Sequence, residues 1–214
     1  MDEVKIRSFS PFSRKLCASF AATAGGVLVG TATDISSDTG RPVVSAAHVA
    51  MNSGWFWAAL AYFVGLFATT KRTASLLGCT ALTAAVISYY TLQLTQGKFE
   101  IVDFGTAHFD THTYWAGYIS KTIFWCVAAC LVGSVVAVAG NVARHGRGKS
   151  VLIWRSLIPI LAAVETFTRL HIETPTKGSV VEAVWSSTFL SAIILMVFMA
   201  IYETYFALRH NSDY

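Results

Sequence analysis

Residues 114–140 read YWAGYISKTIFWCVAACLVGSVVAVAG, an apolar run in which Lys121 is the only charged residue. A helix needs about 20 apolar residues to cross a bilayer, so this run predicts a membrane-spanning helix. Runs of comparable length occur on both sides of it, at 16–33, 43–69, 73–95, 150–170 and 179–207. The run 43–69 is long and its first part, 43–51, contains His48, so one interpretation is an interfacial helix followed by a crossing from about Ser53. We therefore expect an all-α membrane protein, a bundle of about six transmembrane helices that forms a single polytopic domain over residues 1–214.

The composition supports this fold class. Hydrophobic residues make up 54% of the chain and charged residues only 13%, and the mean hydropathy is +0.54. In a soluble domain about a quarter of the residues are charged. The chain therefore has no room for an appended soluble catalytic domain, and we expect its function to lie within the helix bundle or at its mouth.

The positive charges predict how the bundle is oriented. The chain has 16 Lys and Arg residues and a formal net charge of +4. Most of the positive residues form short clusters near the amino terminus, at 71–72 and at 144–149, which the predicted spans place on one side. Because positive loops stay in the cytoplasm, we expect a multi-pass protein of the cell membrane with both termini cytoplasmic. Such clusters are typical of an orientation signal, so no nucleic-acid partner is expected.

Three acidic residues in or near the spans are candidates for chemistry. A charged side chain at the centre of a span costs about 2.5–3.5 kcal/mol, so it requires a partner, a water-filled cavity or a function. Glu165 lies in LAAVETFTRL (161–170), with Arg169 one helical turn further on. Two interpretations stay open: an ion pair that shields both charges, or a buried carboxyl that delivers a proton to an apolar ligand. Asp34 and Glu182 lie near the outer ends of their predicted spans. Each is either a cap or surface residue or a residue that lines an entrance to the bundle.

Aromatic side chains gather in the predicted outer half of the bundle. An aromatic belt at the headgroup level explains some of them. Such a belt is expected at both membrane surfaces, however, and the predicted inner half holds fewer aromatic residues than the outer half. The excess predicts a pocket that binds an apolar ligand or stabilises a cation over ring faces. Asn52 lies at the same depth, either as an amide that ties helices together or as a ligand contact. The aromatic residues are Trp55, Trp57, Tyr89, Tyr90, Tyr114, Trp115, Tyr118 and Trp185.

The longest polar connection, residues 96–113, reads QGKFEIVDFGTAHFDTHT. In an extended segment alternate residues point the same way, so His108, Asp110 and His112 have a spacing that suits one metal ion. A hydrated loop also needs polar residues, and no helical metal-binding signature accompanies these. We expect the hydrated loop and predict neither a metal nor a cofactor.

Several common chemistries have no motif in this chain. There is no Walker loop, no dinucleotide-binding glycine pattern and no G-x-S-x-G elbow. No aspartate cluster of the D-D-x-x-D kind is present to hold magnesium around a diphosphate. An enzyme that handles isoprenoid chains with this sequence would therefore start by protonating an alkene or an epoxide, which intramembrane carboxyls and a dry aromatic pocket would suit.

Three stretches carry a resemblance to a known family: GVLVGTATD (26–34), NSGWFWAALAYFVG (52–65) and LTAAVISYY (82–90). In these the chain resembles the small bacterial integral-membrane terpene cyclases that act on indole or diketopiperazine meroterpenoids. It also resembles a broader group of small actinobacterial membrane proteins. The resemblance covers about the first 95 residues, and the remainder agrees in size and hydropathy.

The resemblance implies a metal-independent, proton-initiated cyclisation of a farnesyl-type chain on an apolar, prenylated small molecule. The acids that match the proton-donor role are Asp34, Glu165 and Glu182, with Glu165 the first choice. The side chains that would stabilise successive cations are Trp55, Trp57, Tyr89, Tyr90, Trp115 and Trp185.

A different class of function fits the same features. A small transporter or a substrate-binding membrane subunit would use intramembrane acids such as Glu165 to bind ions or ligands. Against this, the sequence has no evident inverted repeat and no matched pair of broken helices in its two halves. Both alternatives place the polar site on the outer side of the bundle.

Overall fold

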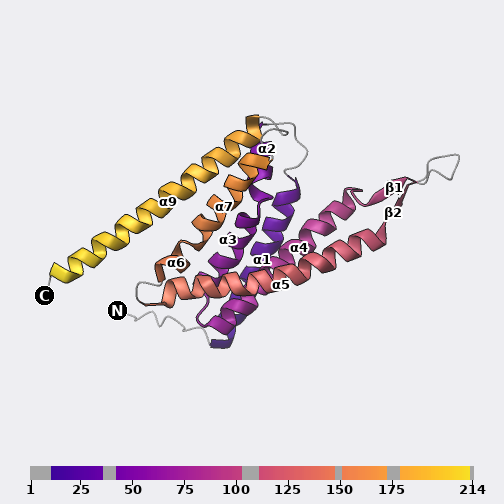
Figure 1. Ribbon diagram of the computed structural model, residues 1–214. Coiled ribbons are helices and arrows are strands. Elements are labelled where there is room, and N and C mark those ends of the chain that lie inside the picture. The colour runs from indigo at the N-terminus through magenta and orange to yellow at the C-terminus, as the bar shows by residue number, and fades with distance from the viewer. Residues whose placement is uncertain (1–10, 36–41, 103–110, 148–150, 173–178, 213–214) are drawn as a thin grey trace, which may run out of the picture.

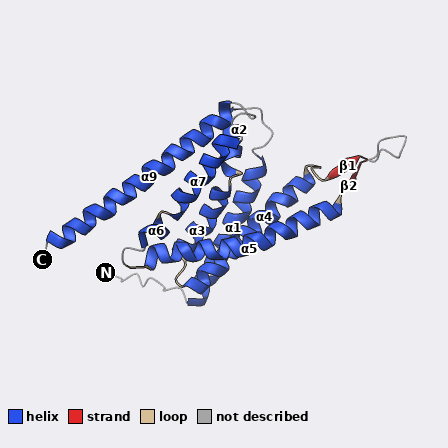
Figure 2. Cartoon of the chain, viewed as in Figure 1, coloured by secondary structure: helices blue, strands red, loops and turns tan. Residues whose placement is uncertain are grey.

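The computed structural model describes residues 11–35, 42–102, 111–147, 151–172 and 179–212. Almost all of these residues are helical, as expected for an all-α protein, and the remainder are short loops and one short antiparallel ribbon (Figure 2). The elements, in order, are α1 (Pro11–Ile35), α2 (Pro42–Met51), α3 (Gly54–Phe67), α4 (Lys71–Thr95), β1 (Glu100–Val102), β2 (Thr111–Thr113), α5 (Trp115–His145), α6 (Val151–Arg155), α7 (Leu157–Ile172) and α9 (Ser179–Ser212).

Three of the described helices are long and apolar enough to cross a membrane. They are α4, α5 and the part of α9 at Ser179–Tyr205, and they coincide with the expected spans 73–95, 114–140 and 179–207. A fourth is reached if the bent pair of α2 and α3 counts as one span. The structure is thus helical with three or four candidate spans, and the expected number of about six is not reached among the described residues.

Two of the expected spans are broken in the structure. The run 43–69 divides into α2 and α3, whose axes differ by 67° across the break. Ser53 at this break has extended backbone angles, φ −99° and ψ 149°. The run 150–170 divides into α6 and α7, with a turn at Ser156 between them. Polar residues interrupt both runs at these points: Asn52 and Ser53 at the first break, and Arg155 and Ser156 at the second. The first break lies where the polar start of the run 43–69 suggested that the crossing begins.

Small residues bring the central helices into backbone contact. α4 packs against α1, α3 and α5 (Figure 1). Gly78 of α4 meets the backbone of α5 at Gly133, and Gly65 of α3 meets that of α5 at Ala137. Membrane helices lack a hydrophobic drive to associate and depend on such close packing.

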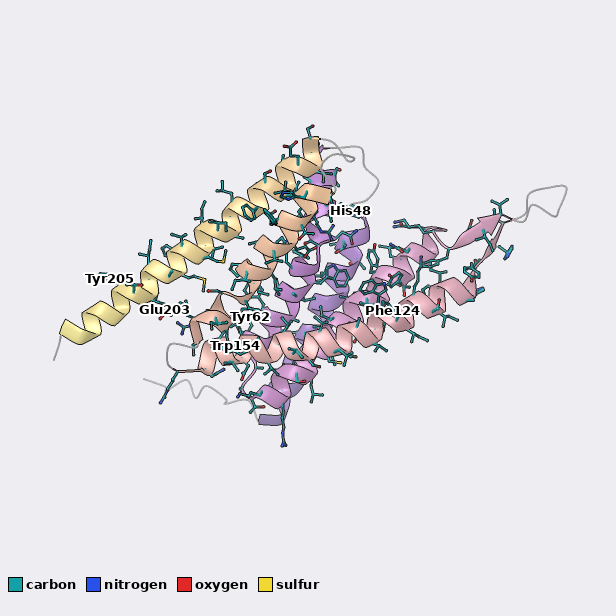
Figure 3. The ribbon with its side chains drawn as sticks, viewed as in Figure 1. His48, Tyr62, Phe124, Trp154, Glu203 and Tyr205 are labelled. Carbon is teal, nitrogen blue, oxygen red and sulfur yellow. The ribbon has the colours of Figure 1, made fainter. Side chains whose placement is uncertain are left out.

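Polar contacts join the carboxyl-terminal part to this core, and Figure 3 labels three of the residues involved, Tyr62, Trp154 and Glu203. The Tyr62 hydroxyl of α3 donates to the backbone oxygen of Trp154 in α6 at 2.9 Å. Arg155 of α6 forms an ion pair with Glu203 of α9. Each of these contacts ties α6 to a different neighbour, and together they fix the short helix between α3 and α9.

The outer surface of α5 and α9 is apolar. Large hydrophobic side chains such as Phe124, Leu131, Leu190 and Phe198 are more than half exposed. In water such faces would be an aggregation hazard, whereas in a bilayer they contact hydrocarbon. The exposed apolar faces are compatible with a membrane protein.

Candidate ligand-binding cavity

A cavity of about 420 Å³ lies between α3, α4, α5 and α7. This size is within the range of pockets that hold small organic ligands. Apolar and aromatic side chains line most of it, and polar groups gather where the loop before α3 meets α7. Its lining residues are Asn52, Ser53, Gly54, Trp57, Ala58, Leu82, Val86, Tyr89, Tyr90, Trp125, Ala128, Ala129, Val132, Glu165 and Arg169.

Four aromatic rings from three helices line the cavity. The rings of Trp57 and Tyr89 meet edge to face with centroids 6.0 Å apart, and those of Tyr89 and Tyr90 do so at 5.3 Å. Trp57 Nε1 donates to the backbone oxygen of Met51 at 3.0 Å. This hydrogen bond satisfies the indole N–H, so that Trp57 presents ring surface to a ligand.

Glu165 forms the polar end of the cavity by capping α3. Its Oε1 accepts the Gly54 backbone N–H at 2.9 Å, and its Oε2 accepts that of Trp55 at 2.7 Å. The first N–H groups of a helix have no partner within the helix. Ser53, the residue before α3, does not supply one, because its hydroxyl donates backwards to the Ala50 oxygen at 2.5 Å. A carboxylate from α7 therefore holds the amino terminus of α3 in place.

Gly54 permits this close approach. A Cβ atom at position 54 would lie 3.0 Å from Glu165 Oε2, which is tighter than ordinary van der Waals contact. The start of α3 can therefore lie this close to α7 only if residue 54 is glycine or if the Glu165 side chain shifts.

Arg169 completes the polar end. Its Nε donates to Glu165 Oε1 at 2.8 Å, so the ion pair that was one of the two interpretations of their spacing is present. The guanidinium also lies over the ring of Trp185, 5.0 Å from the ring centroid. Trp185 is fully buried, and its indole N–H has no partner among the described residues. The Trp185 ring thus stabilises the Arg169 guanidinium through a cation–π contact, on a side of Arg169 that does not line the cavity.

The structure brings together only part of the predicted site. Glu165 lines the cavity with the polar residue Asn52, whose side chain is exposed at the rim. The other predicted residues that line it are Trp57, Tyr89 and Tyr90.

The remaining predicted aromatic residues lie elsewhere. Trp55 packs with a small cluster of α7 and α9 side chains, and Trp185 lies behind Arg169. Tyr114 and Trp115 are exposed at the start of α5. Tyr118 packs on the Phe99 ring with centroids 5.6 Å apart. These residues were predicted by their depth along the membrane, but residues at one depth need not face one cavity.

The other predicted acids do not line the cavity among the described side chains. Glu182 is exposed in the first turn of α9. Asp34 lies in the last turn of α1, but its side chain is outside the described residues. Glu165 is therefore the one acid of the described part that the cavity contains.

The proposed metal ligands of the polar connection fall largely outside the structure. His108 and Asp110 lie outside the described residues, and His112 is an exposed residue of β2 opposite Ile101 of β1. Within the described ranges, no group of three or more His, Cys, Asp or Glu side chains is arranged to hold a metal ion.

Most of the cavity-lining residues that the sequence did not predict lie on α5. Trp125, Ala128, Ala129 and Val132 line it from one face of the helix. Their spacing of three, four and seven residues is the period of a helix face. This small-residue stripe below a tryptophan is readable in the sequence, but nothing in the sequence shows that it faces Glu165 rather than lipid.

The cavity can hold an apolar molecule and present a fixed carboxylate to one end of it. Aromatic faces stabilise positive charge, and the carboxylate can accept a proton or, once protonated, give one up. The three N–H groups around Glu165 stabilise the anion that remains after proton release.

The chain belongs to a family of unknown function, DUF6518, whose model matches residues 10–209. No curated protein and no solved structure matches this chain.

Proposed function

We propose that this protein is an integral-membrane enzyme that cyclises the prenyl chain of an apolar small molecule without a metal. The observation that carries the proposal is the aromatic-walled cavity, which ends at the Glu165 carboxylate. A farnesyl-type chain on an indole or diketopiperazine head is the substrate class we propose, in line with the resemblance to membrane terpene cyclases.

We propose a multi-pass protein of the cell membrane with about six spans and both termini in the cytoplasm. The three long apolar helices support part of this count. Two of the remaining spans would then be the bent pair α2 and α3 and the broken pair α6 and α7, which gain length when each pair is taken together.

The proposed reaction uses the cavity walls to protect a carbocation. Protonation of a terminal alkene or epoxide leaves a cation, an internal double bond attacks it to close a ring, and loss of a proton ends the reaction. The product is an isomer of the substrate. The rings of Trp57, Tyr89, Tyr90 and Trp125 are available to stabilise the cation, and the apolar side chains exclude water that would quench it.

Glu165 is the proposed proton donor in this scheme. Its Oε1 already accepts two hydrogen bonds and its Oε2 only one, so the proton of the acid form is best accommodated on Oε2. After transfer, the N–H groups of Gly54, Trp55 and Arg169 stabilise the carboxylate. The same carboxylate is placed to take back a proton in the last step.

The test is incubation of membranes containing the protein with a farnesylated or epoxy-farnesylated indole in the presence of EDTA. We expect a product of unchanged mass with new rings, identified by mass spectrometry and NMR. Glu165→Gln should lower turnover by at least about a hundredfold, the usual contribution of a general acid. Glu100→Gln, which changes an exposed acid of β1, is the matched control and should retain activity.

A second candidate function is binding or transport, and the broken span favours it. In many transporters a discontinuous helix presents its amino terminus to a bound anion. Here the amino terminus of α3 begins at such a break, and Glu165 occupies it. Failure to form any cyclised product across a panel of prenyl substrates, together with gradient-driven uptake into sealed vesicles, would favour transport over catalysis.

A further inference from the structure

The cavity has an open side that its bounding helices define. α5 and α7 both pack on α3, and α6 joins them at one end. From there they diverge (Figure 1), and in the part of the chain that the structure describes they make hardly any contact with each other. α3 therefore forms the floor of the cavity, and the side opposite α3 is left without a covering helix.

The residues at this open side are apolar and exposed. Trp125 and Val132 line the cavity and are nevertheless 49% and 51% exposed. On the adjacent surface of α5, Phe124 and Leu131 are also exposed and apolar. An opening with such a rim is unfavourable in water and favourable in hydrocarbon. If the bundle lies in a bilayer, this side of the cavity therefore faces the lipid chains.

Small residues form the passage between the two rim residues. Ala128 and Ala129 line the cavity between Trp125 and Val132 on the same face of α5. A chain of methyl-branched carbon atoms can lie along this face without displacing a large side chain. A bulky residue at position 128 would occupy the same space.

The polar end limits the kind of head group that such a chain can carry. Glu165 and Arg169 neutralise each other, so among the described residues no unpaired charge lines the cavity. The Asn52 amide at the rim makes no side-chain hydrogen bond within the described part of the chain. An uncharged head with a hydroxyl, an amide or an indole N–H would suit this amide. A diphosphate would meet only the Arg169 cation, which Glu165 already neutralises.

We infer that the ligand is a neutral, membrane-dissolved amphipath that reaches the cavity sideways from the bilayer between α5 and α7, past Trp125. The chain lies along Ala128 and Ala129, and the head lies near Asn52. This inference shares with the proposed function only the assignment of the cavity as the binding site. It holds whether or not the protein converts the ligand to a product.

Fluorescence quenching by brominated phospholipid tests the opening. The full chain is reconstituted in vesicles of dibromo-phosphatidylcholine, with farnesol as the probe ligand. We expect farnesol to protect part of the tryptophan fluorescence from quenching, because it displaces lipid chains from Trp125. Trp125→Phe should abolish the protected part, whereas Trp115→Phe, which changes an exposed tryptophan that does not line the cavity, should leave it unchanged.

Farnesol retention by the purified protein separates the possible failures. Ala128→Phe should lower retention by about tenfold, which corresponds to about 1.4 kcal/mol of binding free energy. Leu131→Phe, on the neighbouring exposed face, should retain farnesol as the wild type does. Retention without protection of Trp125 would overturn the sideways opening, and lack of retention would overturn the binding site itself. Retention and protection without a cyclised product would refute only the proposed reaction.

Discussion

Glu165 caps the amino terminus of α3 although it lies 111 residues further along the chain. A cap normally comes from the residue just before the helix, and Ser53 is of the right type. Because the Ser53 hydroxyl bonds to Ala50 instead, the capping function passes to a side chain of α7. The same carboxylate therefore joins three parts of the structure: α3, α7 and the wall of the cavity.

Replacement of this carboxylate should destabilise the protein. In Glu165→Ala the N–H groups of Gly54 and Trp55 and the Arg169 guanidinium lose their shared acceptor. Since loss of one cap or one charged hydrogen bond costs about 1–2 kcal/mol, we expect about 2–3 kcal/mol for this variant. Thermal unfolding in detergent measures the loss.

Glu182→Ala is the matched control, because Glu182 lies in the first turn of its own helix and is exposed. Its loss removes only a favourable interaction with the helix dipole, worth about 0.3–1 kcal/mol. Equal destabilisation by the two substitutions would show that Glu165 does not act as a long-range cap.

At the scale of elements, the central helices are held by backbone contacts at glycine. A Cβ atom added to Gly65 would collide with the Ala137 carbonyl of α5, and one added to Gly78 would collide with the backbone at Gly133. Such crossings place the wall formed by α4 and α5 directly against the floor formed by α3. The position of the cavity therefore depends on residues that do not line it.

Gly65→Ala should separate α3 from α5. Overpacking of a close contact costs about 1–3 kcal/mol, and here the neighbouring atom is backbone and cannot turn away. Gly25→Ala provides the comparison, because a Cβ there would meet no atom within 4 Å. It should be neutral or slightly stabilising, since alanine is the better helix former by about 1 kcal/mol. Unfolding temperatures of the two variants in detergent decide the matter, and a neutral Gly65→Ala would contradict the close crossing.

At the scale of the whole molecule, the two ends of the hairpin formed by α4 and α5 should lie on opposite sides of the membrane. α5 has 31 residues, which at about 1.5 Å per residue is long enough to cross a bilayer. Lys98 follows the end of α4 and precedes α5, and Arg147 follows the end of α5. The charge distribution predicts that position 147 is cytoplasmic and position 98 is outside.

Single cysteines test this orientation in a variant whose four native cysteines are replaced by serine. Lys98→Cys should react with a membrane-impermeant maleimide in intact cells. Arg147→Cys should react only after the membrane is permeabilised. The reverse pattern would place both termini on the outer side, and labelling of both positions in intact cells would contradict a spanning α5.

The sequence alone determined the features that depend on local spacing. Apolar length predicted helices at α4, α5 and α9. The four-residue spacing offered the ion pair of Glu165 with Arg169 as one of two interpretations, because one turn of a helix brings these side chains together. The polar start of the run 43–69 indicated a crossing from about Ser53, where the structure breaks this run, whereas the division of the run 150–170 at Ser156 was not predicted.

Only the tertiary structure decided which side chains share the cavity. Trp57, which was predicted for the site, and Trp125, which was not, line it. Trp55 and Trp185 were predicted for the site but pack elsewhere. The depth of a residue in the membrane can be read from its position in an apolar run. The direction it faces depends on how each helix is rotated and crossed against its neighbours. That rotation is set by contacts between distant segments, such as Gly65 against α5 and Glu165 against α3, which no local pattern contains.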